Sequence, residues 1–215
     1  MQLVHFGHAC VLAQTTTGRL LIDPGAFSSG FEQLTGLDAV LVTHQHADHL
    51  DLDRLPALLA ANPGAELLVD AGSAGALGGV PHRVVAPGER VEVGGATVDV
   101  LGGDHAVIHP DVPGIPNNAY LLRDGGADGP GTVLHPGDAF VPAPGPVDVL
   151  LLPTGAPWLK VSEAVDYLRA VAPPVAVPIH QAVLAVPELH YGLFERLAPA
   201  GTRVQIAPHG DPLEL

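Results

Sequence analysis

Short apolar runs, separated by clusters of glycine, proline and polar residues, recur along the whole chain. Runs of this kind are typical of buried strands, because a helix that buries one face shows apolar residues three and four positions apart. The pattern predicts strands at 3–6, 11–13, 20–23, 39–43, 67–69, 83–86, 90–93, 97–101, 119–122, 132–135, 147–152, 175–179 and 203–206.

Helical spacing of apolar residues is found in fewer places. Residues 51–61 place leucines on one face, and Asp51 is the predicted N-cap of this helix. A second helix is predicted over 162–171, with Ser162 as its cap, and a third near 187–197. A short segment rich in alanine and glycine near 73–77 is compatible with a small helix or a loop.

The order of these elements predicts the architecture. Meandering strands come first, helices lie between later strands, and the two halves share a similar rhythm, which favours two packed β-layers with helices outside. The segment 124–131 is interpreted as a hairpin loop and not a linker, because strand-like runs flank it closely. We therefore expect an α/β (α+β) fold in one domain that spans residues 1–215.

Composition excludes several classes of function. Acidic residues outnumber basic ones 23 to 9, and the net charge of −14 disfavours sequence-independent binding to nucleic acid or anionic lipid. Cys10 is the only cysteine, so no intramolecular disulfide is possible. The first residues lack a basic segment followed by an apolar one, and no apolar run approaches the length of a membrane span. These features favour a cytoplasmic protein without membrane or nucleic-acid partners.

The segment from Thr43 to His49, T-H-Q-H-A-D-H, carries the most specific chemistry. Three imidazoles and a carboxylate follow directly after an apolar run, and these are the ligands that Zn²⁺ and similar ions prefer. The pattern H-x-H-x-D-H would arise by chance about three times in a thousand chains of this composition. The segment therefore predicts a metal site.

One ion cannot use all of these side chains, because neighbouring residues on a tight loop point in different directions. We expect His44 and His46 to face one ion and Asp48 and His49 to face a second ion. Each ion needs further ligands from elsewhere, and a catalytic site keeps one position for water.

Three polar residues that follow buried strands can supply the missing ligands. His105 follows the strand at 97–101, Asp138 follows 132–135, and His180 follows 175–179. Polar groups just past buried strands are how a site assembles at one edge of a sheet.

The order of these groups resembles the metallo-β-lactamase-fold hydrolases. The chain shows H-x-H-x-D-H, then His, then Gly-Asp, then His after an apolar strand. The opening Gly7-His8-Ala9 hairpin, the strand end Leu21-Ile22-Asp23-Pro24 and the tail pattern over 148–180 are also similar to that superfamily. Within it, the chain is most similar to the compact cytoplasmic metal-dependent hydrolases, like the L-ascorbate-6-phosphate lactonase group.

The resemblance implies a four-layer αββα sandwich and a binuclear site. It assigns ligands to the first metal (His44, His46, His105), to the second metal (Asp48, His49, His180) and to a bridging position between them (Asp138).

Several assignments leave alternatives. His105 is preferred over His109 because it directly follows the strand and its glycines. His8 and Asp23 are candidates for holding ligand imidazoles by hydrogen bonds, with structural roles as the alternative. His135 is expected to orient a neighbour and not to bind metal.

The predicted function is hydrolysis. Two divalent ions, with Zn²⁺ favoured and Mn²⁺ or Fe possible, lower the pKa of a bridging water and present hydroxide to a polarised carbonyl or phosphoryl group. Asp48 is the candidate catalytic residue that orients this water and accepts its proton. The expected partner is a small-molecule ester, lactone or phosphodiester. The alternative is a non-catalytic binding or regulatory module that the metal stabilises.

Specificity is expected to reside in loops. The candidates lie near 26–36, 108–118 and 155–161, and Trp158 in the last of these either covers the pocket or serves packing alone.

Overall fold

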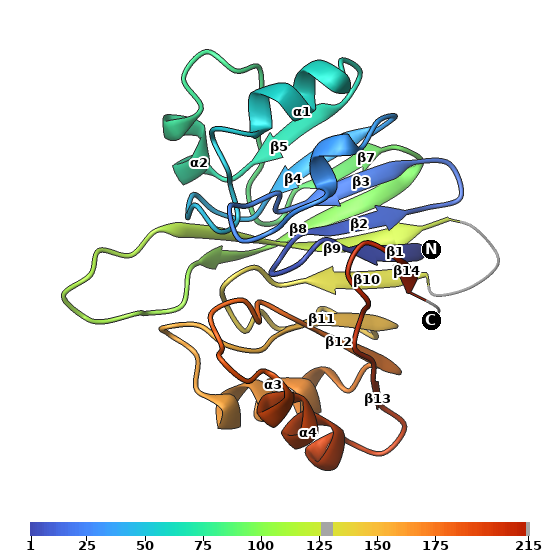
Figure 1. Ribbon diagram of the computed structural model, residues 1–215, viewed down its shortest axis with the longest axis vertical. Coiled ribbons are helices and arrows are strands. Elements are labelled where there is room, and N and C mark those ends of the chain that lie inside the picture. Colours follow the sequence, from blue (N-terminus) through green and yellow to red (C-terminus); the bar gives the residue numbers. More distant parts are fainter. Residues whose placement is uncertain (126–130, 214–215) are drawn as a thin grey trace.

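Two seven-stranded sheets form the centre of the molecule (Figure 1). The structure is a computed structural model, and it describes residues 1–125 and 131–213. The first sheet has the order β14 (Pro212–Leu213), β1 (Gln2–His5), β2 (Val11–Gln14), β3 (Arg19–Ile22), β4 (Ala39–Val42), β5 (Glu66–Val69) and β6 (Arg83–Val84). The second has the order β13 (Arg203–Val204), β12 (Val175–Ile179), β11 (Val149–Pro153), β10 (Thr132–His135), β9 (Pro116–Asp124), β8 (Ala96–Asp104) and β7 (Arg90–Val93).

Both sheets change from antiparallel to parallel pairing along the chain. Strands β1 to β3 and β7 to β10 form antiparallel meanders, whereas β3 to β6 and β10 to β13 pair in parallel. Parallel neighbours need a crossover connection. Helices α1 (Leu55–Ala61) and α2 (Ala71–Ala76) provide the crossovers in the first sheet, and α3 (Val161–Val171) and α4 (Glu188–Leu197) provide them in the second. The 3₁₀ helix η1 (Phe31–Gln33) lies between β3 and β4.

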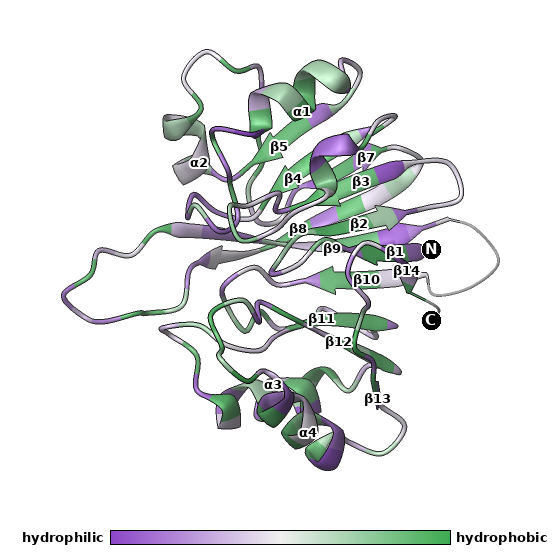
Figure 2. Cartoon of the chain, in the orientation of Figure 1, coloured by the Kyte–Doolittle hydropathy of each residue, from purple (hydrophilic) through white to green (hydrophobic). Residues whose placement is uncertain are grey.

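Three apolar clusters bind the layers together. The cluster between the sheets contains Leu20 and Ile22 from β3 together with Val133 from β10, all fully buried. Leu21, between the first two in sequence, belongs to the cluster under α1 instead, as the two-residue period of a strand requires. A third cluster packs α3 and α4 on the second sheet through residues such as Phe194. Figure 2 shows the apolar strands at the centre and the mixed helices outside.

This arrangement confirms the predicted αββα sandwich. Strands β3, β4 and β10 begin and end within one residue of their predicted bounds. Strands β9 and β10 pair antiparallel, as the hairpin interpretation of 124–131 requires, although residues 126–130 of that loop lie outside the described part of the chain. No helix within the described ranges is both long enough and apolar enough to cross a membrane.

Several predicted boundaries were wrong. Helix α1 begins at Leu55 and not near Asp51, whose carboxylate instead accepts the N–H groups of Asp53 and Arg54 in the preceding turn. Pro56 explains the late start, because proline lacks an N–H and is tolerated in the first turn of a helix. Helix α3 begins at Val161, so Ser162 is not its N-cap.

Strands β8 and β9 are longer than the apolar runs that predicted them, whereas β6 and β13 are shorter than predicted. Strands β8 and β9 pair over nine residues each, because antiparallel hydrogen bonding continues through Gly102 and Gly103, where the apolar pattern has ended. Strands β6 and β13 have two residues each, and β14 is too short to show a pattern. The segment near 73–77 forms α2, and the Asp70 carboxylate caps it by accepting the N–H groups of Gly72 and Ser73.

Gly25 makes the closest backbone contact with the loop that follows β4. A Cβ atom at this position would lie 1.8 Å from the carbonyl oxygen of Asp48 and 2.5 Å from the nitrogen of His49. Ala26 beside it donates its N–H to the Ala47 carbonyl at 2.7 Å. The position of the loop that carries the predicted metal ligands therefore depends on the absence of a side chain at residue 25.

We expect Gly25→Ala to displace this loop and to lower the free energy of unfolding by about 1–3 kcal/mol, the usual cost of overpacking. Thermal unfolding and the zinc content of the purified variant measure the two effects. Gly64→Ala is the matched control, because nothing lies within 4 Å of the added Cβ there. Equal melting temperature and zinc content in both variants would contradict this account.

Candidate metal centre

The ends of strands from both sheets deliver the predicted ligands to one edge of the sandwich. The loop after β4 carries His44, His46, Asp48 and His49, and this loop comes from the first sheet. The second sheet contributes His105 and His180, which directly follow β8 and β12, and Asp138, which lies three positions after the end of β10. The seven side chains are separated by up to 136 positions in sequence, and the fold brings all of them together.

The first group consists of His44, His46, His105 and Asp138. One possible ligand atom from each lies within 4.8 Å of the others. The Nε2 atom of His44 is 3.0 Å from the Nδ1 atom of His46. All members except His46 are buried.

The second group consists of His8, Asp48, His49 and His180, and its ligand atoms meet the same 4.8 Å limit. The Nε2 atoms of His49 and His180 face each other at 3.1 Å. His8 donates its Nε2 hydrogen to Asp48 Oδ2 at 3.0 Å, and its ring lies 3.8 Å from that of His180, centroid to centroid. Asp48 is the most open member, with 21% of its side chain exposed.

Asp138 lies between the two groups. Its Oδ1 atom is 3.1 Å from the Nε2 atoms of both His49 and His180, and its Oδ2 atom is 3.4 Å from His105 Nε2. The indole N–H of Trp158 donates to Oδ2 at 2.8 Å. One buried carboxylate therefore faces donors of both groups, which is the geometry that a bridging ligand needs.

Hydrogen bonds outside the groups fix the orientation of the imidazoles. Asp23 accepts the Nδ1 hydrogen of His49 at 2.7 Å and both the N–H and the hydroxyl of Thr43 at 2.8 Å. His180 and His105 donate from Nδ1 to the carbonyl oxygens of Gly155 and Ala106, at 2.5 and 2.6 Å. In all three histidines Nε2 is left to point inward, and partners of this kind typically fix the tautomer of a metal ligand.

Backbone strain is concentrated at the same place. Among the described residues, four that are not glycine have positive φ. Three of them are His8, Asp23 and His180, with φ angles of 50°, 50° and 62°. The His180 N–H donates to the His8 carbonyl at 2.8 Å, which locks two of these residues together. Such conformations cost free energy and persist where surrounding contacts hold them, often at functional sites.

The donor set fits a metal. His105 Nε2 and Asp138 Oδ1 are buried and have no hydrogen-bond partner within the described residues, although each has other possible ligand atoms nearby. Buried polar atoms are rarely left without a partner. Imidazole nitrogen and carboxylate oxygen at these spacings are the ligands of Zn²⁺ and related ions. Each of the two groups could therefore hold a metal ion.

Burial keeps several of these imidazoles neutral. It lowers the pKa of His44 well below its ordinary value and, together with the nearby His105, lowers that of His46. Burial also lowers the pKa of His8 to about 4, against the opposing effect of Asp48. Neutral imidazole is the form that binds a metal.

Carboxylates reverse this effect in the second group. Burial favours the neutral form of His49, but Asp138 and Asp23 outweigh it and raise its pKa well above the ordinary value. Asp138 and Asp48 likewise outweigh burial at His180 and raise its pKa to about 9. The surroundings of these two rings therefore favour positive charge.

The structure separates the residues that the sequence left as alternatives. His105 lies in the first group, whereas His109 is exposed, belongs to neither group and accepts the N–H of Asp111 through its Nδ1 atom. His135 is buried outside both groups, with its Nε2 atom 2.9 Å from the Ala9 carbonyl and 3.7 Å from Asp23 Oδ2.

His8 and Trp158 lie closer to the candidate ligands than the sequence indicated. His8 was predicted only to hold a ligand, yet its side chain is a member of the second group. The Gly7-His8-Ala9 hairpin was its only signal. Trp158, for which the sequence left packing as an alternative, contacts Asp138 directly.

Comparison with known proteins agrees with this geometry. The family model described as a beta-lactamase superfamily domain matches residues 2–180. The chain belongs to the beta-lactamase superfamily. Among similar proteins, Protein Rv0786c of Mycobacterium tuberculosis is 52% identical over 211 residues, or 97% of each chain. The UPF0173 metal-dependent hydrolase MJ1163 of Methanocaldococcus jannaschii is 26% identical over 98% of each chain.

A solved structure shows the same superfamily fold. The metallo-beta-lactamase fold protein YhfI of Bacillus subtilis has a TM-score of 0.76 to this chain, at 18% identity over 99% of both chains. At this identity the likeness establishes the fold alone.

The variant Asp23→Asn tests whether the hydrogen bonds of Asp23 orient the His49 ring in the second group. The Asp23 carboxylate accepts three hydrogens on its two oxygens, two from Thr43 and one from His49. The amide has one accepting oxygen and a donating NH2 group, so it cannot keep all three bonds, and the His49 ring loses its fixed orientation. We expect affinity for zinc to fall by about 10- to 100-fold, measured by competition with a chromogenic chelator.

Asp38→Asn is the control for this variant. Asp38 also accepts a backbone N–H, from Arg19, but it precedes β4, at the end of the strand opposite the histidine loop. If Asp23→Asn binds zinc as tightly as Asp38→Asn does, Asp23 does not support the site.

Proposed function

We propose that this protein is a hydrolase that holds two divalent ions. His44, His46 and His105 hold the first ion, Asp48, His49 and His180 hold the second, and Asp138 bridges them. The observation that carries the proposal is the position of the Asp138 carboxylate, which faces His105 on one side and both His49 and His180 on the other.

Two such ions supply Lewis acidity: they lower the pKa of a water molecule toward neutrality and polarise a carbonyl or phosphoryl group. The remaining steps fall to side chains of the chain. Asp48 is the carboxylate of the site with the most exposed side chain, so it is the group that accepts a proton from the nucleophile. The Nε2 hydrogen of His8 holds Asp48 in place at 3.0 Å.

The preferred ion is zinc. The first ion has three imidazole ligands and one carboxylate oxygen, a set that suits Zn²⁺. Two carboxylates at the second ion, Asp48 and Asp138, also accept Mn²⁺ or Fe.

The substrate is a small ester, lactone or phosphodiester, and the site of action is the cytoplasm. A cavity of about 400 Å³ adjoins the first group, with His46 and His105 in its wall. A metal that only stabilised the fold would need four closed ligands and no adjoining cavity, which favours a catalytic role over a binding or regulatory module.

His46→Ala tests the ligand set. It removes one imidazole from the first ion, so we expect about one ion per chain in place of two, and hydrolysis lowered by about 10³-fold or more. Elemental analysis of the zinc-loaded variant measures the first result. Initial rates on bis-p-nitrophenyl phosphate and a panel of esters and lactones measure the second.

His82→Ala is the control, because His82 is an exposed histidine whose ring contacts only a carbonyl of its own loop. Two ions and full hydrolysis in His46→Ala would overturn the ligand set. One tightly held ion in the unaltered protein, without turnover of any ester, lactone or phosphodiester, would instead establish the non-catalytic module.

A further inference from the structure

The loop between β8 and β9 forms one wall of the cavity beside the first group of ligands. It projects from the sheet edge as a long arm over residues 105–115 (Figure 1), and residues 105–110 and 112–115 contribute to the lining. His46, from the histidine loop, is the one lining residue outside this arm. A molecule in the cavity would therefore contact the arm and the first metal site together.

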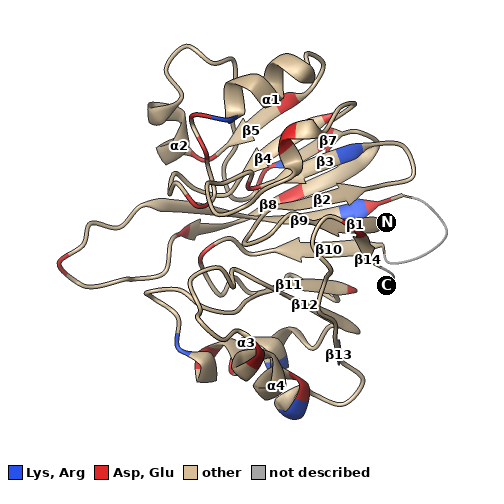
Figure 3. Cartoon of the chain, viewed as in Figure 1, with Lys and Arg blue, Asp and Glu red and all other residues tan. Residues whose placement is uncertain are grey.

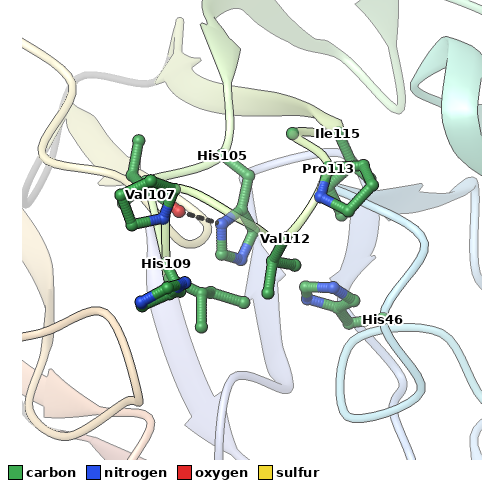
Figure 4. A pocket seen from close by; sticks show the side chains of 11 residues that line it. His46, His105, Val107, His109, Val112, Pro113 and Ile115 are labelled. Atoms are coloured by element: carbon green, nitrogen blue, oxygen red, sulfur yellow. Dashed lines mark hydrogen bonds between the residues drawn. The ribbon is translucent and has the colours of Figure 1, made fainter.

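The lining is apolar apart from its imidazoles. Figure 4 shows Val107, Val112 and Pro113 gathered around the rings of His46 and His105. Val107 and Val112 are 72% and 48% exposed, which leaves hydrocarbon surface at the entrance to a polar site. Apolar patches next to a few convergent polar groups are typical of small-molecule pockets.

Within residues 1–125 and 131–213, no ammonium, guanidinium or carboxylate lines the cavity. The arm carries a single charged residue, Asp111, whose side chain is 92% exposed. Figure 3 shows acidic colouring at the tip of the arm and no basic colouring along it. A site that recognises a phosphate or carboxylate tail usually presents arginine or lysine to it. This cavity presents neither.

The basic side chains of the protein lie outside this cavity. Arg54 pairs with Asp51 and Glu32 beside η1, and Arg90 and Arg123 share Asp99 on the second sheet. Lys160, the only lysine, is exposed at the start of α3 and does not line the cavity. With a net charge of −14, the protein as a whole also repels anions.

We propose that the site hydrolyses esters or lactones whose non-reacting part is uncharged and apolar, a hydrocarbon chain or ring that packs against Val107, Ile108 and Val112. This inference rests on the proposed hydrolase function and narrows its substrate class. It disfavours substrates with a second anionic group, such as a sugar phosphate lactone. A volume of about 400 Å³ lies at the small end of cavities that hold such molecules.

The zinc-loaded protein tests this inference with p-nitrophenyl esters of acetate, butyrate and hexanoate. Transfer of a methylene to an apolar surface predicts that kcat/KM rises about two- to fourfold for each one added. The p-nitrophenyl monoester of adipate has the length of the hexanoate ester but ends in a carboxylate. We therefore expect its kcat/KM to be at least about tenfold lower than that of the hexanoate ester.

The double variant Val107→Ser, Val112→Ser removes the hydrocarbon surface of the arm. We expect the ratio of kcat/KM for hexanoate over acetate to fall about tenfold, chiefly through a higher KM for hexanoate. Val84→Ser is the control, because Val84 is 45% exposed on β6 and outside the cavity. Neither variant touches a proposed metal ligand.

Binding supplies a readout that does not depend on turnover. Trp158 is the only tryptophan and contacts Asp138, so its fluorescence reports occupancy of the site by acetohydroxamate or hexanohydroxamate. The hexanoyl compound should bind more tightly to the unaltered protein, and the double variant should remove this preference.

The outcomes separate the two proposals. If no ester, lactone or phosphodiester is hydrolysed, the proposed function fails, and the hydroxamates still test the apolar pocket. If hydrolysis occurs at a rate independent of chain length, if adipate is preferred over hexanoate, or if the double variant behaves like Val84→Ser, the apolar substrate class is overturned and the hydrolase remains.

Discussion

The site depends on the contacts that compensate the buried carboxylate of Asp138. An ionised carboxylate in the interior is costly unless positive charge or hydrogen bonds compensate it. Trp158 supplies one hydrogen bond, and the imidazoles of His49 and His180 stand 3.1 Å away, with their pKa values raised above the ordinary range. The surroundings of Asp138 thus favour positive charge on both sides, and divalent cations supply it without protonating the rings.

The sandwich makes this burial possible because it brings two sheet edges together. The ligand loop ends a strand of the first sheet, whereas Asp138 and His180 end strands of the second. Apolar packing between the sheets holds these edges in register. Local strain at His8, Asp23 and His180 is then stabilised by hydrogen bonds that cross between the halves, such as that from His180 to the His8 carbonyl. Neither half of the chain could hold this geometry alone.

The two ends of the site have different chemistry. Most of the histidines and carboxylates at the strand ends are buried, and fixed partners orient His49, His105 and His180, which suits the precise placement of ions. The arm at 105–115 is apolar and open to solvent, and it lies beside His105 and His46. Because the arm is a loop on a rigid sheet, its side chains can define which molecule enters without changing how the ions are held.

Much of the site could be predicted from sequence, because its ligands lie directly after apolar strands. The H-x-H-x-D-H segment and the positions of Asp138 and His180 determined which chemistry the chain carries, and the apolar runs determined the two-layer core. Helix α1 begins later than the leucine spacing predicts, because Pro56 lies in its first turn. The close approach of His8 to Asp48, the contact of Trp158 with Asp138 and the apolar arm were decided by the tertiary structure. Each joins residues tens of positions apart, and spacing along the chain carries no information about such distances.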